Sequence, residues 1–294
     1  MQHLQDYRRL ALTEQIQLIM SKVQVSAWRL QLHTPLVHAT TPMIRGVWGH
    51  ALRQIDRSLY DLAFAGVNNT GQNLPRYILR PAPPDPLTAP ALDWILFGIN
   101  QSHEPALWRA WDKACAMGLG PDRVPFQIRK RRLLAPDNLP TAARAWSLPE
   151  VTWPLPDDPA STPCVLKCEV PVRLIKRKQL IAAPTFVDLI TGAVRRIAAL
   201  AGLPRSEAYA DIMRAAKSVA RRTLAEPWVG EDCQVVRWSA AQQKEVKLYG
   251  VTGAMALPNG PGSFWPLLAA AQWTHIGKGT VFGMGELRIY PLSR

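Results

Sequence analysis

The sequence has few cysteines, no long apolar run and no signal-peptide core, which argues against a disulfide-rich secreted domain and against a membrane protein. Its 294 residues include only four cysteines, too few for the disulfide framework of a small secreted domain. No apolar run reaches the roughly 18 residues that cross a bilayer. The polar start, MQHLQDYRRL, has no signal-peptide core. We therefore expect a soluble, cytoplasmic protein that does not contact a membrane.

The sequence also lacks the residue clusters that bind metals and cofactors. Its six histidines do not gather with Asp and Glu into a set of metal ligands. Cys164 and Cys168 share one face of an expected strand, but no histidine neighbours them, so core packing is favoured over zinc binding. No serine or cysteine lies in the context of an activated nucleophile. We expect neither a metal nor a small-molecule cofactor.

The chain is rich in positive charge and in apolar residues. Its formal net charge is +13, its pI is about 10.0, and 25 of its 35 basic residues are arginine, which suits phosphate and base contacts. With 48% apolar residues and 11 tryptophans it can bury a real core, and its length suggests two domains. A solvated basic surface would also explain the charge, but a polyanionic partner is favoured.

A glycine-rich loop lies between an expected helix, 264–273, and an expected strand, 286–290. Glycine accepts positive φ and lets backbone N–H groups face a ligand, so such a loop can hold phosphate oxygens. A dinucleotide fingerprint is excluded because it must open a βαβ unit, and a P-loop is excluded because Gly279 follows Lys278 where Ser or Thr is needed. We predict nucleic-acid contacts from His275, Gly277, Lys278, Gly279, Gly283 and Gly285.

Seven prolines between residues 136 and 163 separate two halves of the chain, because proline fixes φ and removes a hydrogen-bond donor. In each half the hydrophobic periodicity predicts strand, helix, strand, strand, helix, strand. We predict an α+β protein with two tandem ferredoxin-like (βαββαβ, RRM-like) domains. An N-terminal helix and the first domain fill 1–135, an extended linker fills 136–163, and the second domain fills 164–294 with a basic helix inserted at 206–224.

Several short motifs, in their order and spacing, resemble the RAMP superfamily of CRISPR-associated proteins, in the family that processes CRISPR repeat RNA. They are Arg45-Gly46-Val47-Trp48-Gly49-His50-Ala51-Leu52-Arg53, Tyr77-Ile78-Leu79-Arg80-Pro81, Leu96-Phe97-Gly98, Arg237-Trp238-Ser239 with Gln242 or Gln243, Gly250 and Gly253, and His275-Ile276-Gly277-Lys278. The resemblance implies a metal-independent endoribonuclease that cuts precursor CRISPR RNA beside its repeat hairpin and keeps the mature guide RNA bound. The inserted helix resembles the type IV branch of this family.

Metal-free RNA cleavage uses the substrate's own 2′-hydroxyl as the nucleophile. It needs a base near that hydroxyl, an acid for the leaving 5′-oxygen, and cations around the pentacoordinate phosphate. His50 is the preferred histidine, because imidazole titrates near neutrality and the residue lies on the expected first helix, whose apolar pattern runs to position 62. His50, Arg53 and Arg57 recur at helical spacing opposite the apolar stripe. Gly46 and Gly49 are expected to leave that surface bare, although a capping or packing histidine remains the alternative.

Arginine competes for the catalytic role. Its pKa is too high for proton transfer near neutrality, but it stabilises the charge of a phosphorane. Arg29, Arg45 and Arg237 are the candidates, since arginines of the first strand and of the second-domain hairpin can point toward the cleft between domains. His33 and His38, in the loop before the first helix, could reach the same site.

The inserted helix is expected to bind RNA phosphates, because its late charges are all positive and a ferredoxin-like core does not require it. A purely solvated face is the alternative. The predicted contact residues are Arg214, Lys217, Arg221 and Arg222, and the basic run 129–132 is expected to bind backbone phosphates as well. The sequence thus predicts an endoribonuclease for a CRISPR repeat RNA hairpin, with other CRISPR effector subunits as further partners. The alternative is a non-catalytic RNA-binding subunit of an effector complex.

Overall fold

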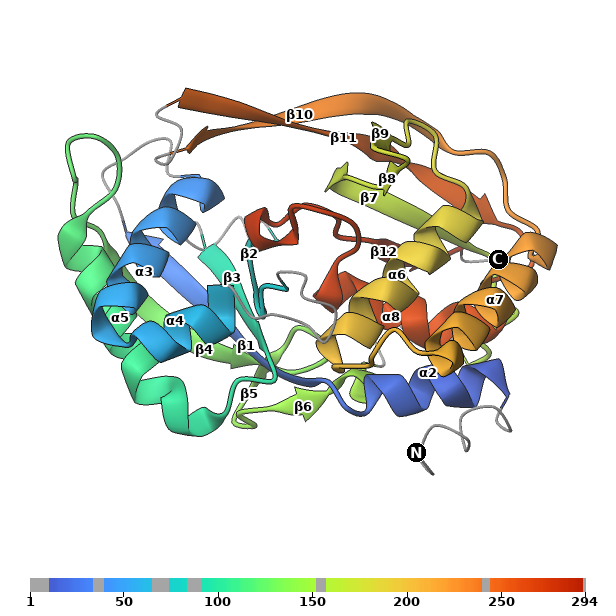
Figure 1. The fold of residues 1–294 in the computed structure, drawn as a ribbon, viewed down its shortest axis with the longest axis horizontal. Helices are drawn as coiled ribbons and strands as arrows, with labels where there is room; N and C mark the ends of the chain where they lie inside the picture. Colours follow the sequence, from blue (N-terminus) through green and yellow to red (C-terminus); the bar gives the residue numbers. More distant parts are fainter. Residues whose placement is uncertain are drawn as a thin grey trace.

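The computed structural model describes residues 11–33, 40–64, 74–83, 91–151, 157–239 and 244–292. Within these ranges the chain forms two main antiparallel sheets, each with its own helices (Figure 1). None of the described helices combines the length and the apolar composition that crossing a membrane requires.

The first domain has four main strands in a six-stranded sheet, and helices cover one face of it. Its elements are β1 (Gln24–His33), α3 (Thr41–Ile55), α4 (Arg57–Phe64), β2 (Tyr77–Pro81), β3 (Ala91–Phe97), η2 (Gln101–His103), α5 (Glu104–Met117) and β4 (Gln127–Leu134). The strands lie in the order β2-β3-β1-β4, and every neighbouring pair is antiparallel. Because consecutive side chains on a strand face opposite ways, Leu30, Leu79 and Trp94 pack against the helices while their neighbours face the second domain.

The second domain repeats this topology. Its elements are β7 (Cys164–Val172), β8 (Ile175–Lys176), β9 (Gln179–Leu180), α6 (Phe186–Leu200), α7 (Glu207–Arg222), β10 (Val229–Ser239), β11 (Lys244–Leu257), η4 (Gly262–Phe264), α8 (Trp265–Thr274), η5 (Thr280–Phe282) and β12 (Arg288–Pro291). The main sheet has the order β10-β11-β7-β12. Both sheets therefore have the strand order of a ferredoxin-like domain, which confirms the predicted fold. Cys164 and Cys168 lie in the core, as predicted, and burial raises the pKa of their thiols to about 11 and about 12.

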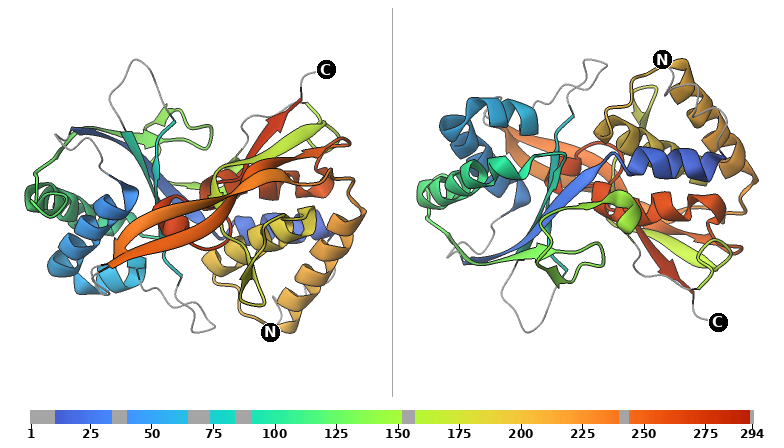
Figure 2. Two further views of the ribbon diagram at one scale, coloured as in Figure 1. Left: turned by 90° about the horizontal axis from the view of Figure 1, so that it is seen from above. Right: turned by 90° about the horizontal axis from the view of Figure 1, so that it is seen from below.

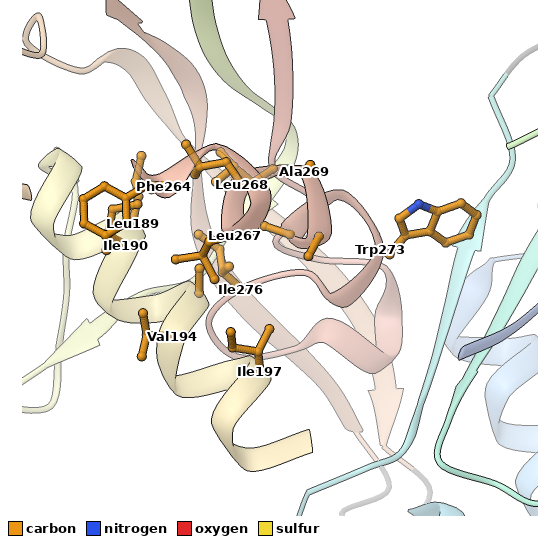
Figure 3. Packing of buried hydrophobic residues seen from close by; sticks show 14 of the residues in the cluster. Leu189, Ile190, Val194, Ile197, Phe264, Leu267, Leu268, Ala269, Trp273 and Ile276 are labelled. Atoms are coloured by element: carbon orange, nitrogen blue, oxygen red, sulfur yellow. The ribbon is translucent and has the colours of Figure 1, made fainter. Parts of the chain in front are cut away.

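Helix α8 packs on α6 and β12 of the second domain, and its side chains belong to the core that the two domains share. Every residue from Leu267 to Thr274 is buried, as expected for a helix that is apolar on all sides. Its side chains share one hydrophobic cluster with residues of α2 (Leu12–Met20) and α6 and with Val25, Ile78 and Phe97 of the first sheet. In Figure 3, Trp273 points away from the other labelled side chains toward the first-domain strands. The domains therefore meet through a continuous apolar core.

The proline-rich connection packs against the first domain rather than spanning open solvent. Its described part contains β5 (Pro140–Thr141), which extends the sheet beside β4, β6 (Trp146–Ser147), which pairs with β1, and η3 (Leu148–Glu150). The Nε1–H group of Trp146 donates to the Leu134 carbonyl over 3.0 Å, and Leu148 is buried. The connection is thus part of the folded body over these residues.

The expected long first helix is in fact two helices, which is a correction to the sequence prediction. α3 ends at Ile55, and Asp56 adopts an extended conformation with φ −152° and ψ 103°. The Asp56 carboxylate accepts hydrogen bonds from the Leu59 amide at 2.9 Å and from the Ser58 hydroxyl at 2.7 Å, so it caps α4. The apolar spacing continues across the break, which is why periodicity alone did not reveal it.

Candidate nucleic-acid interface

Segments of both domains meet beside α3. The closing loop, residues 275–287, carries η5, which lies against β2 and α3 of the first domain. The long β10–β11 hairpin extends from the second sheet and reaches α3 with β10 (Figures 1 and 2). A ligand at α3 would therefore lie close to elements of both domains.

The guanidinium group of Arg45 lies close to three aromatic rings at this junction. Its central carbon is 5.0 Å from the ring centre of Phe64, 5.0 Å from that of Phe282 and 5.9 Å from that of Tyr77. These distances are within the range of cation–π attraction. In the ranges that the structure describes, no carboxylate forms an ion pair with Arg45. Its Nε is buried without a hydrogen-bond partner there.

The Tyr77 hydroxyl leaves the charge of Arg45 intact. Burial raises the pKa of Tyr77 far above its ordinary value, against an opposing effect of Arg45, so the phenol stays neutral. Arg45 is therefore a full positive charge held by neutral groups, and such a charge favours a bound phosphate.

The two glycines of α3 have different roles. Gly46 is exposed, and a Cβ atom added there would meet nothing within 4 Å, so the helix surface beside Arg45 is bare, as predicted. Gly49 is buried instead, and a Cβ atom there would lie 2.6 Å from the Phe64 ring. The prediction was wrong for Gly49, whose missing side chain makes room for an aromatic ring rather than for RNA.

His50 and Arg53 are exposed on α3, but Arg57 does not continue their face. The His50 imidazole is hydrogen-bonded to the Gln54 amide nitrogen over 2.8 Å, which holds the ring along the helix. Arg57 belongs to α4, beyond the break at Asp56, and its Nε contacts the Asp61 carboxylate at 3.2 Å. The predicted three-residue row is therefore reduced to His50 and Arg53.

The closing loop is folded tightly and is not an open phosphate cradle. Gly277, Gly279, Gly283 and Gly285 all have φ between 79° and 82°, which glycine tolerates best. A Cβ atom on Gly285 would lie 2.0 Å from the Ile276 carbonyl oxygen. The amides of residues 276, 278, 282, 283 and 285 donate to protein carbonyls. Gly283 and Gly285 are buried, which leaves Gly277, Lys278 and Gly279 as the accessible part of the loop.

His275 is completely buried, so its imidazole cannot touch RNA in this structure. Its Nδ1–H group donates to the Met284 carbonyl over 3.0 Å, while its Nε2 has no partner among the described residues. Burial lowers the pKa of His275 to about 4, which makes the ring neutral near pH 7. We assign it the structural role of closing the turn after α8, where its φ is 54°.

Arg29 belongs to an ion-pair row on the opposite face of the first sheet from α3. It forms two hydrogen bonds to buried Asp93, at 2.8 and 3.1 Å, and Asp93 also contacts Arg80 at 3.4 Å. Arg80 reaches Glu286 of the second domain at 2.8 Å, and Glu286 pairs with Arg288 at 2.9 Å. The adjoining pocket, of about 220 Å³, is lined by three arginines that are all paired with carboxylates. Arg29 is thus separated from Arg45 by the sheet.

The inserted helix, α7, lies at the other end of the molecule from α3 (Figures 1 and 2). Its apolar side packs against α6 and α2, and Arg214, Arg221 and Arg222 are exposed while Lys217 is half-buried. Arg214 forms an ion pair with Asp211. The structure therefore does not bring the basic face of α7 to the same place as Arg45.

Some predicted residues cannot be placed. His38, Gln242, Gln243 and the side chain of Arg237 lie outside the described residues, although the Arg237 backbone pairs with Val246 near the tip of the hairpin. His33 is exposed at the end of β1. The described ranges contain no group of three His, Cys, Asp or Glu residues that could hold a metal ion.

Sequence reasoning missed the aromatic neighbours of Arg45 and the charges between the domains. Phe282 lies inside the glycine motif and Arg80 lies inside the motif of residues 77–81, but the sequence alone indicated no role for either. Alternation along β2 would have placed Arg80 on the interface face with Ile78. No local pattern connects Phe282 with Arg45, because 237 positions separate them in the chain.

The comparisons with known proteins point to one family. A family model described as CRISPR-associated endoribonuclease Cas6 matches residues 162–287. A solved Cas6 product complex has a TM-score of 0.60 at 17% identity and covers 92% of this chain and 100% of that one. A Thermus thermophilus Cas6 structure has a TM-score of 0.56 at 16% identity, with 92% and 99% covered. A partial Cas6-RT-Cas1–Cas2 complex has a TM-score of 0.56 at 13% identity, with 94% and 48% covered. No curated protein sequence matches this chain.

Proposed function

We propose that this chain, a Cas6-type protein by the family match of its second domain and by its fold, is an endoribonuclease that cleaves precursor CRISPR RNA at the repeat hairpin. The observation that carries the proposal is Arg45. It is a cation without a carboxylate partner in the described ranges, held where both domains meet, beside the bare backbone of Gly46. Such a charge can stabilise the negative charge that develops on the phosphorane during RNA cleavage.

The reaction needs no group from outside the RNA and the protein. The 2′-oxygen upstream of the cut forms a bond to phosphorus as its proton leaves to a base, and the bond from phosphorus to the 5′-oxygen breaks as that oxygen takes a proton. The products are a 2′,3′-cyclic phosphate and a 5′-hydroxyl. Arg45 stabilises the extra negative charge of the transition state, which a guanidinium can do without exchanging a proton. His50, exposed on the same helix, is the proposed proton-transfer group.

Binding of the RNA is assigned to the exposed basic groups. Lys278 on the closing loop and Arg53 on α3 lie on elements that meet at the junction, and the α7 arginines lie at the far end. An RNA that contacts both ends must extend along the long axis of the molecule (Figure 1). Membership of the type IV branch, retention of the guide RNA and assembly with other CRISPR effector subunits remain proposals.

The test is incubation of the protein with end-labelled repeat RNA in EDTA. We expect one shorter product with a 2′,3′-cyclic phosphate end, and no product from a matched RNA with a 2′-deoxy nucleotide immediately upstream of the cut. Both RNAs should bind equally well, since only the nucleophile has changed. Cleavage that stops in EDTA and returns with magnesium would replace this mechanism with a metal-dependent one.

The same assay distinguishes an endoribonuclease from the alternative function. A non-catalytic RNA-binding subunit would bind both RNAs tightly and release no product from either. Cleavage lost in Arg45→Ala with hairpin binding kept would support the catalytic role. Equal cleavage by Arg45→Ala and the wild type would remove Arg45 from the mechanism.

A further inference from the structure

We infer that Phe282 of the closing loop is a positioning residue whose ring fixes the Arg45 guanidinium in place, so that the second domain completes a catalytic group of the first. This inference rests on the proposed function, because it gives a role to a residue that holds the catalytic cation. Phe282 itself is not assigned any contact with the RNA.

Arg45 differs from the arginines of the interface in what holds it. Arg29 and Arg80 are fixed by Asp93 and Glu286, and these carboxylates cancel most of their charge. Arg45 is held by rings instead, at 5.0 Å from Phe64 and 5.0 Å from Phe282. Aromatic faces attract a cation through their quadrupole but carry no net charge. This aromatic cage, formed by Phe64, Tyr77 and Phe282, therefore restricts the side chain and leaves its full positive charge for a phosphate.

Phe282 is the part of the cage that comes from the second domain. Phe64 and Tyr77 are buried in the first-domain core, where their rings contact Trp48 and each other. Phe282 is half-buried and packs against the edge of that core. Without Phe282, the Arg45 guanidinium would lose one of the two rings at 5.0 Å, and the side chain would regain part of its rotamer freedom.

The loop around Phe282 gives the ring a defined position. Gly279 and Gly283 flank η5 with φ values of 82° and 81°, and the amides of Phe282 and Gly283 donate to the carbonyls of Gly279 and Thr280 at 2.9 and 3.0 Å. A Cβ atom on Gly283 would lie 3.1 Å from the Leu79 carbonyl oxygen, so the loop packs directly on β2. The glycine motif thus serves to deliver Phe282 to Arg45 rather than to bind phosphate with its amides.

The expected signature is a slower chemical step with unchanged binding. Phe282→Leu keeps an apolar side chain but removes the π face. We expect it to lower the single-turnover cleavage rate about tenfold, which corresponds to about 1.4 kcal/mol, while hairpin affinity stays the same. Phe282→Tyr retains the ring and should restore most of the rate.

A double-mutant cycle tests whether Phe282 acts through Arg45. In an Arg45→Ala background, Phe282→Leu should cost nothing further, because the group that it positions is gone. Phe264→Leu is the control, since Phe264 is a fully buried ring that contacts Phe186 and not Arg45. Its effect should add to that of Arg45→Ala. Full additivity of Phe282→Leu with Arg45→Ala would overturn the inference.

A second readout does not depend on activity. The Arg45 Nε–H resonance, identified by its loss in Arg45→Lys, should carry a ring-current shift that changes in Phe282→Leu and returns in Phe282→Tyr. An unchanged resonance in Phe282→Leu would refute the positioning role even if cleavage were slower. If the wild-type protein binds RNA but does not cleave it, the proposed function fails, and this resonance alone still decides whether Phe282 positions Arg45.

Discussion

Acidification from pH 7 toward pH 4 should destabilise the folded protein through the imidazole of His275. The ring is completely buried, its Nδ1–H is used by the Met284 carbonyl, and its Nε2 has no partner among the described residues. Adding a proton at Nε2 would place a charge in this apolar site, close to Arg196 and Arg80. Glu286 opposes this effect, but burial dominates, so the pKa of His275 falls from 6.5 to about 4.

The size and direction of the effect follow from proton linkage. Between pH 6.5 and pH 4 the unfolded chain binds a proton at His275 that the folded chain does not. The contribution of His275 to the free energy of unfolding is therefore fully present above pH 6.5. It falls by about 1.4 kcal/mol per pH unit as the pH drops, and about 3 kcal/mol is lost near pH 4. This is a large part of the 5–15 kcal/mol that stabilises an ordinary domain.

The assay is urea unfolding at several pH values for the wild type and His275→Asn. Asparagine suits this position because it tolerates the positive φ of 54°. Its amide does not titrate, and the other titrating groups cancel in the difference between the two proteins. The stability difference should therefore shift in favour of the variant by about 3 kcal/mol between pH 7 and pH 4.

A difference that stays constant with pH would refute this reasoning. It would mean that the imidazole is protonated equally in the folded and unfolded chains, and hence that water or RNA can reach it. Glu286, an electrostatic neighbour of His275, is present in both proteins. Burial would raise the pKa of Glu286, but Arg80, His275 and Arg288 together outweigh burial and hold that pKa below its usual value.

Three further predictions concern the site and the loop. His50→Ala should slow single-turnover cleavage by roughly 10²- to 10⁴-fold without weakening hairpin binding, and a change below about tenfold would move proton transfer to another group. Gly285→Ala should lower the free energy of unfolding in urea by more than about 2 kcal/mol, because the new Cβ would meet the Ile276 carbonyl oxygen at 2.0 Å. Gly202→Ala, with positive φ but open space around it, is the control that should cost less. Replacing the four basic residues of α7 with alanine should flatten the salt dependence of RNA affinity by about 0.7 to 0.9 in log–log slope per lost phosphate contact and leave the melting temperature unchanged. A lower melting temperature with an unchanged slope would show that α7 is only a brace. The four basic residues of α7 replaced in this experiment are Arg214, Lys217, Arg221 and Arg222.

The topology could be predicted from the sequence because it depends on local signals. Pro42 at the first turn of α3 and the capping Thr185 before α6 mark helix starts, and alternation along β1 marks a strand. The inserted helix was equally visible, from its apolar stripe and from Ser206 as its N-cap. These signals need no knowledge of distant residues.

The environment of each site residue could not be predicted, because it depends on contacts between distant segments. The glycine spacing of the closing loop is compatible with a phosphate cradle or a packed joint. The tertiary contacts decide between them, because the loop amides donate to protein carbonyls and Gly283 packs against Leu79. The burial of His275 and the pairing of Arg29 with Asp93 are likewise set by tertiary packing. The catalytic role of Arg45 stays a prediction, and no local pattern in the sequence indicated the rings that surround its guanidinium group.

The position of α8 has a consequence for how the protein is made. A ribosome releases the first-domain sheet long before it releases α8. Until then, Val25, Ile78 and Phe97 of that sheet lack the α8 side chains with which they form one buried cluster. During that time these apolar side chains are available to chaperones and to other nascent chains. Arg45 likewise lacks the Phe282 ring until η5 has been synthesised and docked. A partly made chain can therefore carry the basic surface that attracts RNA without yet holding the cation that we propose to cut it.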